Sequence, residues 1–102
     1  MTKETDSAAE TTAAILDRLF EVIESRRDGD SDASYTAKLL ARGTPKIAQK
    51  VGEEAVETVI EAMKADGGKL AEESADLLYH LLVLWADKDV RPDEVWSVLA
   101  ER

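Results

Sequence analysis

The sequence has no cysteine and little proline, glycine or aromatic residue. Its 102 residues include 2 prolines and 5 glycines, and aromatic residues make up 5% of the chain. The lack of cysteine excludes disulfides, thiolate nucleophiles and zinc–sulfur sites. Prolines and glycines are too few for the many turns of a small β-sandwich or barrel, so the long stretches between them favour helices.

Long hydrophobic runs are also absent. The longest uninterrupted apolar run, Leu81 to Ala86, is far shorter than the roughly 20 residues that span a bilayer. The first fourteen residues lack the basic and then apolar pattern of a signal peptide. We therefore expect no association with a membrane and a cytoplasmic location.

Positive charge is scarce relative to negative charge. The chain has 13 Lys and Arg residues against 22 Asp and Glu residues, and its net charge is −9 at pH 7. Such a chain repels phosphate backbones, so nucleic acid is not an expected partner. A nucleotide that chelates a divalent cation remains a suitable ligand, because the cation bridges carboxylates to phosphate oxygens.

The remaining composition is typical of one folded domain. Hydrophobic residues make up 44% and charged residues 34% of the chain, which suggests helices with ion pairs on their surfaces. A chain of this length forms one core. We assign residues 1–10, which are small, polar and aperiodic, to a flexible tail, and residues 11–102 to one all-α domain.

Apolar spacing, caps and breakers predict a bundle of four to five helices. The expected helices cover about residues 11–27, 34–42, 44–65, 69–88 and 92 onward. Ser34 or Thr36 can cap the second helix, and Thr44 can cap the third, with a proline in its first turn. The turn Gly67-Gly68 joins the third and fourth helices, so we expect them to form a central antiparallel pair.

One side of the third predicted helix is charged and the other side is apolar. At 100° per residue, six charged residues of the helix fall within a sector about 100° wide. They are Lys46, Lys50, Glu53, Glu54, Glu57 and Glu61, opposite Ile47, Val51, Ala55, Val59, Ala62 and Met63. Taken alone, such a stripe is most often a solvated face with ion pairs along it.

The fourth predicted helix has a polar stripe in an otherwise apolar surface. From Leu77 onward its side chains are apolar almost all round, so most of its circumference should be buried. Glu73, Asp76 and His80 nevertheless stand above one another at i, i+3 and i+7. We interpret the single histidine as a buried, hydrogen-bonded residue rather than a metal ligand.

The two helices together predict a cluster of carboxylates. Glu54-x-x-Glu57 and Glu73-x-x-Asp76 lie on either side of the two-glycine turn, so four carboxylates can converge between the helices. Each pair at ~4 Å repels by on the order of 4 kcal/mol at an effective dielectric constant of ~20. Ligands that are all oxygen favour Mg²⁺, with Mn²⁺ as a substitute. A di-iron bundle needs Glu-x-x-His on two helices, and this chain has one histidine.

Three runs of the sequence are similar to a known signature. They are Ser34-Tyr35-Thr36, then Lys46-x-x-x-Lys50-Val-Gly-Glu53-Glu54-x-x-Glu57, and then Glu73-x-x-Asp76. Over about residues 12–102 the chain resembles the all-α nucleotide pyrophosphohydrolase superfamily and, within it, the phosphoribosyl-ATP pyrophosphatase family.

The resemblance implies an activity and a set of site residues. The implied reaction is the Mg²⁺-dependent hydrolysis of phosphoribosyl-ATP to phosphoribosyl-AMP and pyrophosphate, the second step of histidine biosynthesis. Carried over by position, the carboxylates would hold the metal and two lysines would face the substrate phosphates. The metal ligands would be Glu54, Glu57, Glu73 and Asp76, and the lysines Lys46 and Lys50.

Several roles stay open on the residues alone. Glu53, Glu54 and Glu57 are all candidates for the catalytic group that accepts the proton of the attacking water. Ser34 and Thr36 can act as helix cap or as phosphate donor in substrate binding. Tyr35 can stack on a base or pack at the start of its helix.

We also expect a homodimer. The fourth helix presents more apolar surface than its neighbours can cover, at Leu78, Leu81, Leu82 and Trp85. Two alternative functions remain. One is a house-cleaning nucleoside triphosphate pyrophosphohydrolase, and the other is a non-enzymatic acidic helical dimer that binds a partner through its charged face.

Overall fold

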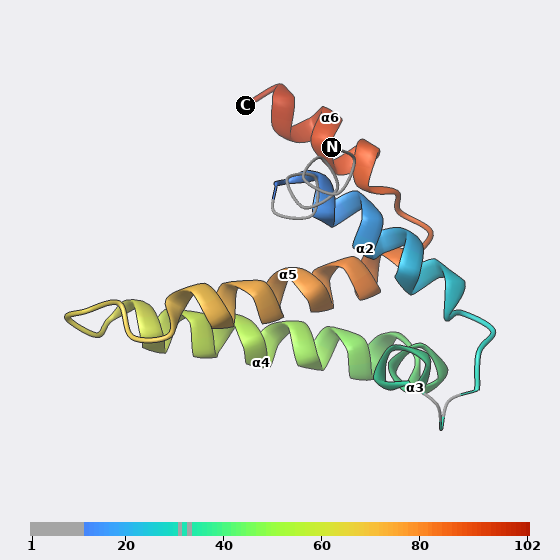
Figure 1. The fold of residues 1–102 in the computed structure, drawn as a ribbon, viewed down its shortest axis with the longest axis horizontal. Helices are drawn as coiled ribbons and strands as arrows, with labels where there is room; N and C mark the ends of the chain where they lie inside the picture. The colour runs from blue at the N-terminus through green and yellow to red at the C-terminus, as the bar shows by residue number, and fades with distance from the viewer. Residues whose placement is uncertain (1–11, 31, 33) are drawn as a thin grey trace, which may run out of the picture.

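A computed structural model describes residues 12–30, 32 and 34–102, so the predicted tail at residues 1–10 lies outside the described residues. The described part of the chain contains five α-helices and no strand, which confirms the prediction of an all-α fold (Figure 1). In chain order the helices are α2 (Ala14–Ser25), α3 (Tyr35–Arg42), α4 (Thr44–Ala62), α5 (Leu70–Asp87) and α6 (Pro92–Ala100).

Local signals explain where α3 begins and ends. The Ser34 hydroxyl oxygen accepts a hydrogen bond from the Ala37 backbone N–H at 2.9 Å, so Ser34 is the cap. The other predicted cap, Thr36, lies inside the helix, and its hydroxyl contacts the Tyr79 hydroxyl instead. Gly43 ends the helix with φ 89°, in the left-handed region that favours glycine.

The predicted cap of α4 is wrong. Gly43 is the N-cap residue and Thr44 is the first residue of the helix, with Pro45 in the first turn as predicted. Because a single residue separates α3 from α4, that residue ends one helix and begins the next. The Thr44 hydroxyl donates a hydrogen bond to the Asp87 carboxylate on α5 rather than to its own backbone.

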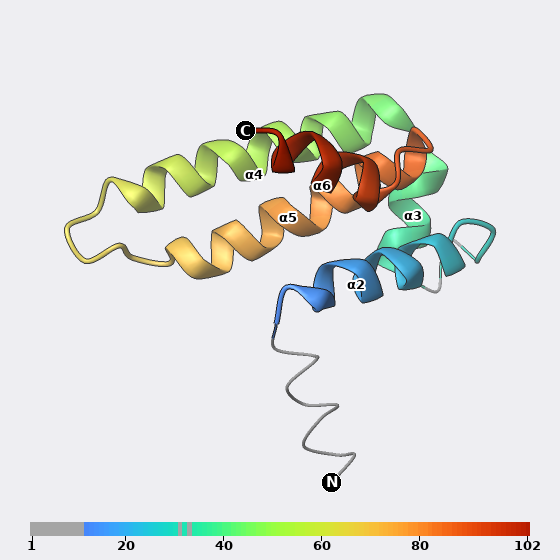
Figure 2. The same cartoon turned by 90° about the horizontal axis from the view of Figure 1, so that it is seen from above.

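Helices α4 and α5 lie side by side and are joined by a loop at one end (Figures 1 and 2). Gly67 and Gly68 in this loop have φ 78° and 48°. The Glu61 carboxylate accepts the Lys69 backbone N–H at 2.9 Å and lies 3.0 Å from the Lys64 Nζ. A Cβ at Gly68 would lie 2.4 Å from Glu61 Oε1 and displace this side chain, and the positive φ of Gly68 itself favours glycine.

The hydrophobic core lies at the other end of the α4–α5 pair. Helices α2, α3, α4 and α5 all contribute to it, and its buried side chains are Phe20, Ile23, Leu39, Ile47, Leu82, Val83 and Ala86. The expectation that Leu82 would be surplus apolar surface is therefore wrong, because this side chain is buried within the chain. Leu81 and Trp85 are half-buried, and Leu78 is exposed.

Helix α6 packs on α2 and α5 through a few side chains. The Trp96 ring meets the Trp85 ring edge-on at 5.9 Å, and its indole N–H donates to the Asp17 carboxylate at 3.3 Å. The Arg91 guanidinium lies 5.7 Å from the centre of the Phe20 ring. Val98 and Leu99 on α6 are exposed.

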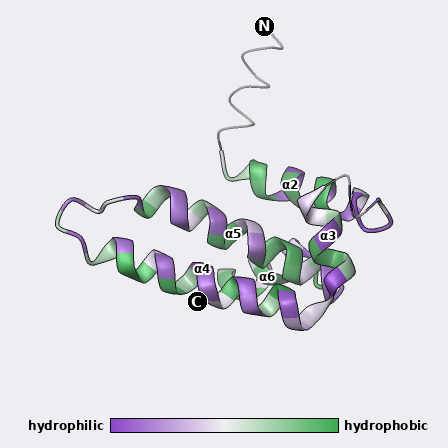
Figure 3. Cartoon of the chain, turned by 90° about the horizontal axis from the view of Figure 1, so that it is seen from below, coloured by the Kyte–Doolittle hydropathy of each residue, from purple (hydrophilic) through white to green (hydrophobic). Residues whose placement is uncertain are grey.

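Near the loop, α4 turns its apolar side outward. Val56, Val59, Ile60 and Met63 are exposed, with 81% of the Met63 surface accessible. Figure 3 shows hydrophobic segments on this part of α4. An amphipathic helix normally buries its apolar side, so the orientation of α4 at this end is the reverse of the usual one.

None of the helices in the described ranges is long and apolar enough to cross a lipid bilayer.

Candidate metal centre

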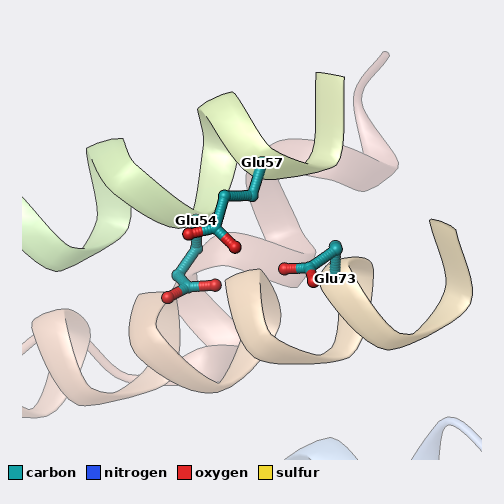
Figure 4. A group of neighbouring side chains, drawn as sticks. All are labelled: Glu54, Glu57 and Glu73. Atoms are coloured by element: carbon teal, nitrogen blue, oxygen red, sulfur yellow. The ribbon is translucent and has the colours of Figure 1, made fainter. Parts of the chain in front are cut away.

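Three carboxylates meet between α4 and α5. Glu54 and Glu57 extend from α4 toward Glu73 on α5 (Figure 4), and one oxygen from each lies within 4.8 Å of the others. The spacing of three residues on α4 places two of them on one face, and the pairing of the helices adds the third. Glu54 is buried, Glu73 is half-buried and Glu57 is exposed.

Asp76 and Glu53 lie outside this group. Asp76 stands one turn after Glu73 on α5 and is exposed. Glu53 is exposed on α4, where its carboxylate accepts a hydrogen bond from the Gln49 amide at 2.8 Å. The structure therefore brings together three of the four predicted metal ligands.

The negative charge of the Glu73 carboxylate is poorly compensated by its surroundings. Its Oε1 is buried and has no hydrogen-bond partner among the described residues. Desolvation raises the pKa of Glu73, and the negative charges of Glu57, Asp76 and Glu54 raise it further. A buried carboxylate oxygen without a partner is unfavourable unless a proton or a cation compensates it.

The donor set fits a hard divalent cation. All three converging groups are carboxylates, and one oxygen among them is buried and unpaired within the described ranges. Mg²⁺ and Mn²⁺ prefer such ligands, whereas zinc and copper prefer nitrogen or sulfur donors that this group lacks.

Lys50 lies at the edge of the carboxylates. Its Nζ is 3.3 Å from Glu53 Oε1 and 3.7 Å from Glu54 Oε2. The hydrogen bond to Glu53 raises the pKa of Lys50, so the ammonium stays charged. The pKa of Glu53 is lowered by its hydrogen bonds to Gln49 and Lys50 and, to a smaller degree, by the charge of Lys46.

His80 joins α5 to the start of α3. Its Nδ1 is 2.7 Å from the Asp76 carbonyl oxygen, and its Nε2 is 3.0 Å from the Tyr35 hydroxyl. A carbonyl only accepts, so Nδ1 carries the hydrogen of the neutral ring and Nε2 accepts from the tyrosine. The interpretation of His80 as a buried, hydrogen-bonded residue is confirmed, since 5% of it is exposed.

Tyr35 lies against two other rings. It stacks near Tyr79 at 6.2 Å between centroids and meets the His80 ring edge-on at 5.9 Å. Half of the residue remains exposed. Tyr35 therefore packs at the start of its helix, and the exposed half of its surface remains accessible to a ligand.

Sequence reasoning missed Thr58. Its hydroxyl is 2.8 Å from the Glu54 carbonyl oxygen and 3.3 Å from the Glu73 carbonyl oxygen. The signal was available, because Thr58 stands one turn after Glu54 and therefore lies beside it, at the edge of the charged stripe of α4.

The fold and the site together define a class of protein. It is an all-α protein with an acidic site between two helices that suits a divalent cation, beside a lysine that can meet an anionic ligand.

Comparison with known proteins narrows this class. Residues 16–102 match the family described as phosphoribosyl-ATP pyrophosphohydrolase. The phosphoribosyl-ATP pyrophosphatase of Azospirillum brasilense is 62% identical over 91 residues, which cover 89% of this chain and 82% of that protein. The protein of the same name from Paramagnetospirillum magneticum is 61% identical over 88 residues, covering 86% and 81%.

The chain belongs to the phosphoribosyl-ATP pyrophosphohydrolase family, a family of hydrolases, and the resemblance seen in the sequence is confirmed.

Proposed function

We propose that this chain hydrolyses phosphoribosyl-ATP to phosphoribosyl-AMP and pyrophosphate with Mg²⁺ as cofactor, the second step of histidine biosynthesis. The observation that carries the proposal is the convergence of Glu54, Glu57 and Glu73 between α4 and α5 in a chain of this family.

The proposed metal ligands are Glu54, Glu57 and Glu73, with Asp76 as the fourth. Asp76 stands one turn after Glu73, and its charge already acts on that carboxylate. Mn²⁺ is the expected substitute because it accepts the same oxygen ligands. When bound, the ion neutralises phosphate charge and makes a water more acidic.

Lys50 and Lys46 are the proposed phosphate-binding residues. They stand one turn apart on the charged stripe of α4, and Lys50 already contacts the edge of the carboxylate group. An ammonium at this position offsets the negative charge that develops on the departing pyrophosphate. Ser34 can also donate to a phosphate, because its oxygen accepts the cap hydrogen bond and its own hydrogen has no acceptor among the described residues.

Glu54 and Glu57 are the proposed acceptors of the proton from the attacking water. Glu53 is the weaker candidate, because its two hydrogen bonds lower its pKa and so reduce its basicity. Thr36 is likewise the weaker candidate for a phosphate donor, since its hydroxyl already contacts Tyr79.

We further infer that residues 11–102 form one domain that associates as a homodimer, with the antiparallel α4–α5 pair at its centre. The outward side of α4 supports this, because Val56, Val59, Ile60 and Met63 form an exposed apolar patch. Sedimentation should show a dimer at micromolar concentration, and a stable monomer would contradict the inference.

Product analysis tests the activity. The purified chain is incubated with phosphoribosyl-ATP, with dUTP and with other nucleoside triphosphates, each with Mg²⁺ and with a chelator. We expect equal amounts of phosphoribosyl-AMP and pyrophosphate from the first substrate only, and only with the metal. Faster turnover of dUTP or another triphosphate would favour a house-cleaning enzyme, and no turnover of any substrate would favour a non-enzymatic role.

A thermal titration tests the metal site separately. The midpoint of unfolding should rise with Mg²⁺ concentration, because an ion that binds only the folded chain stabilises it by mass action. An unchanged midpoint would mean that the three carboxylates are a solvated stripe.

A further inference from the structure

The Thr58 hydroxyl lies between the backbones of α4 and α5 at the level of the carboxylates. It is 2.8 Å from the Glu54 carbonyl oxygen on its own helix and 3.3 Å from the Glu73 carbonyl oxygen on the neighbouring helix. Thr58 also follows Glu57 directly in the chain. The Thr58 side chain therefore contacts the backbone of two cluster residues, and its own backbone is joined to the third.

The chemistry of this contact requires a hydroxyl. Both partners are carbonyl oxygens, which only accept, so Thr58 must be the donor to each. Its one hydrogen is shared between the nearer Glu54 carbonyl and the more distant Glu73 carbonyl on the neighbouring helix. Threonine has few side-chain rotamers in a helix, so the position of this hydroxyl is well defined.

The residues around Thr58 explain why a contact between α4 and α5 is needed beside the carboxylates. The three carboxylates repel one another and so push α4 and α5 apart. The buried apolar side chains that hold the pair together lie at the other end, near α2 and α3. Two α4 hydroxyls contact α5 within the described residues: Thr58 beside the carboxylates, and Thr44, which bonds Asp87 at the core end.

We propose that Thr58 is a positioning residue, which holds α4 and α5 at the separation that places Glu54, Glu57 and Glu73 around one cation. This inference rests on the proposed function, because the residues that Thr58 positions are the proposed metal ligands. The hydroxyl itself touches neither substrate nor metal in this proposal.

The test compares three variants of the full chain with the wild type. Thr58→Val keeps the shape and removes the hydroxyl, Thr58→Ser keeps the hydroxyl, and Thr44→Val makes the same change at the core end of the same helix pair. The readout is the Mg²⁺ concentration that gives half of the full rise in melting temperature, measured without substrate. Mn²⁺ serves as a second probe.

We expect Thr58→Val to raise this concentration about tenfold, the usual scale for losing a residue that orients a metal ligand. Thr58→Ser should stay within about twofold of the wild type, because it still donates to both carbonyls. Thr44→Val should lower the melting temperature of the metal-free chain and leave the Mg²⁺ midpoint within about twofold. In turnover assays, Thr58→Val should shift the Mg²⁺ requirement by a similar factor, with a smaller change in kcat at saturating Mg²⁺.

The outcomes separate the two proposals. A wild type that Mg²⁺ does not stabilise would overturn the metal site and, with it, the role of Thr58. A stabilised wild type with an unchanged midpoint in Thr58→Val would overturn the role of Thr58 alone, as would equal shifts in Thr58→Val and Thr58→Ser. If Thr58→Val does not fold, Thr58→Ala against Thr58→Ser provides the same comparison.

Discussion

The two ends of the α4–α5 pair contain opposite kinds of contact between the same helices. At the core end, Ile47 on α4 and Leu82 and Val83 on α5 are buried among side chains from α2 and α3. At the loop end, Glu54, Glu57 and Glu73 occupy the space between the helices, while the apolar side of α4 faces outward.

This difference places the contacts that stabilise the fold at one end of the helix pair and the carboxylates of the candidate site at the other. Burying a side chain the size of leucine or isoleucine contributes about 1.5–3 kcal/mol, so the core end supplies favourable free energy. The loop end has carboxylates that repel one another and a buried oxygen with no partner in the described part of the chain, both of which are unfavourable in the metal-free chain. Substitutions at the two ends should therefore have opposite effects on stability and activity.

The largest expected effect is on activity at the loop end. Glu57→Gln should lower the rate of pyrophosphate release by about 10³-fold, because it removes one proposed metal ligand from the site and leaves the core intact. The melting temperature without metal should stay the same or rise. Glu72→Gln is the matched control, since Glu72 is exposed on α5 outside the group, and it should retain activity within about twofold. A comparable loss in both variants would contradict the assignment.

The next effect is on stability at the core end. Leu82→Ala should lower the free energy of unfolding by about 2–5 kcal/mol, because the buried leucine leaves a cavity. The same change at the exposed Leu99 on α6 should lower it by less than about 1 kcal/mol. Urea unfolding measures both values. Similar losses at the two positions would mean that the core does not lie where the structure places it.

A smaller effect concerns the pH dependence of the metal-free chain. Because the folded-state pKa of Glu73 is raised, folded protein keeps a proton that unfolded protein releases, so stability falls as pH rises from the ordinary glutamate pKa through the raised one. Glu73→Gln should remove this fall and so be more stable than the wild type at neutral pH. Urea unfolding with a chelator, from pH 4 upward in roughly unit steps, measures the difference. A difference that grows toward acidic pH would contradict the sign.

The smallest effect is expected at the junction of α3 and α5. Tyr35→Phe removes the donor to His80 Nε2 and should lower the free energy of unfolding by about 1 kcal/mol. The loss is small because half of Tyr35 is exposed, so water can reach the Tyr35 side of its contact with His80. Thermal unfolding measures the change, and a loss above about 3 kcal/mol would mean that the tyrosine belongs to the core.

Some features of the protein follow from the sequence by itself. Ser34 caps α3 and Gly43 ends it because both act on the backbone within a few residues of themselves. The two glycines of the loop mark the turn between α4 and α5 for the same reason. The spacing of Glu54 and Glu57 places both carboxylates on one side of α4 wherever that helix lies. Local geometry is sufficient for each of these conclusions.

Other features were decided only by the tertiary structure. Periodicity shows that α4 has a charged side and an apolar side, but packing against α5 determines that the charged side faces inward near the loop. Leu82 is buried among side chains of other helices, Thr44 bonds Asp87, and Thr58 contacts Glu73. Each of these contacts joins residues that are distant in the chain. They depend on the register and separation of two helices, which no single helical pattern contains.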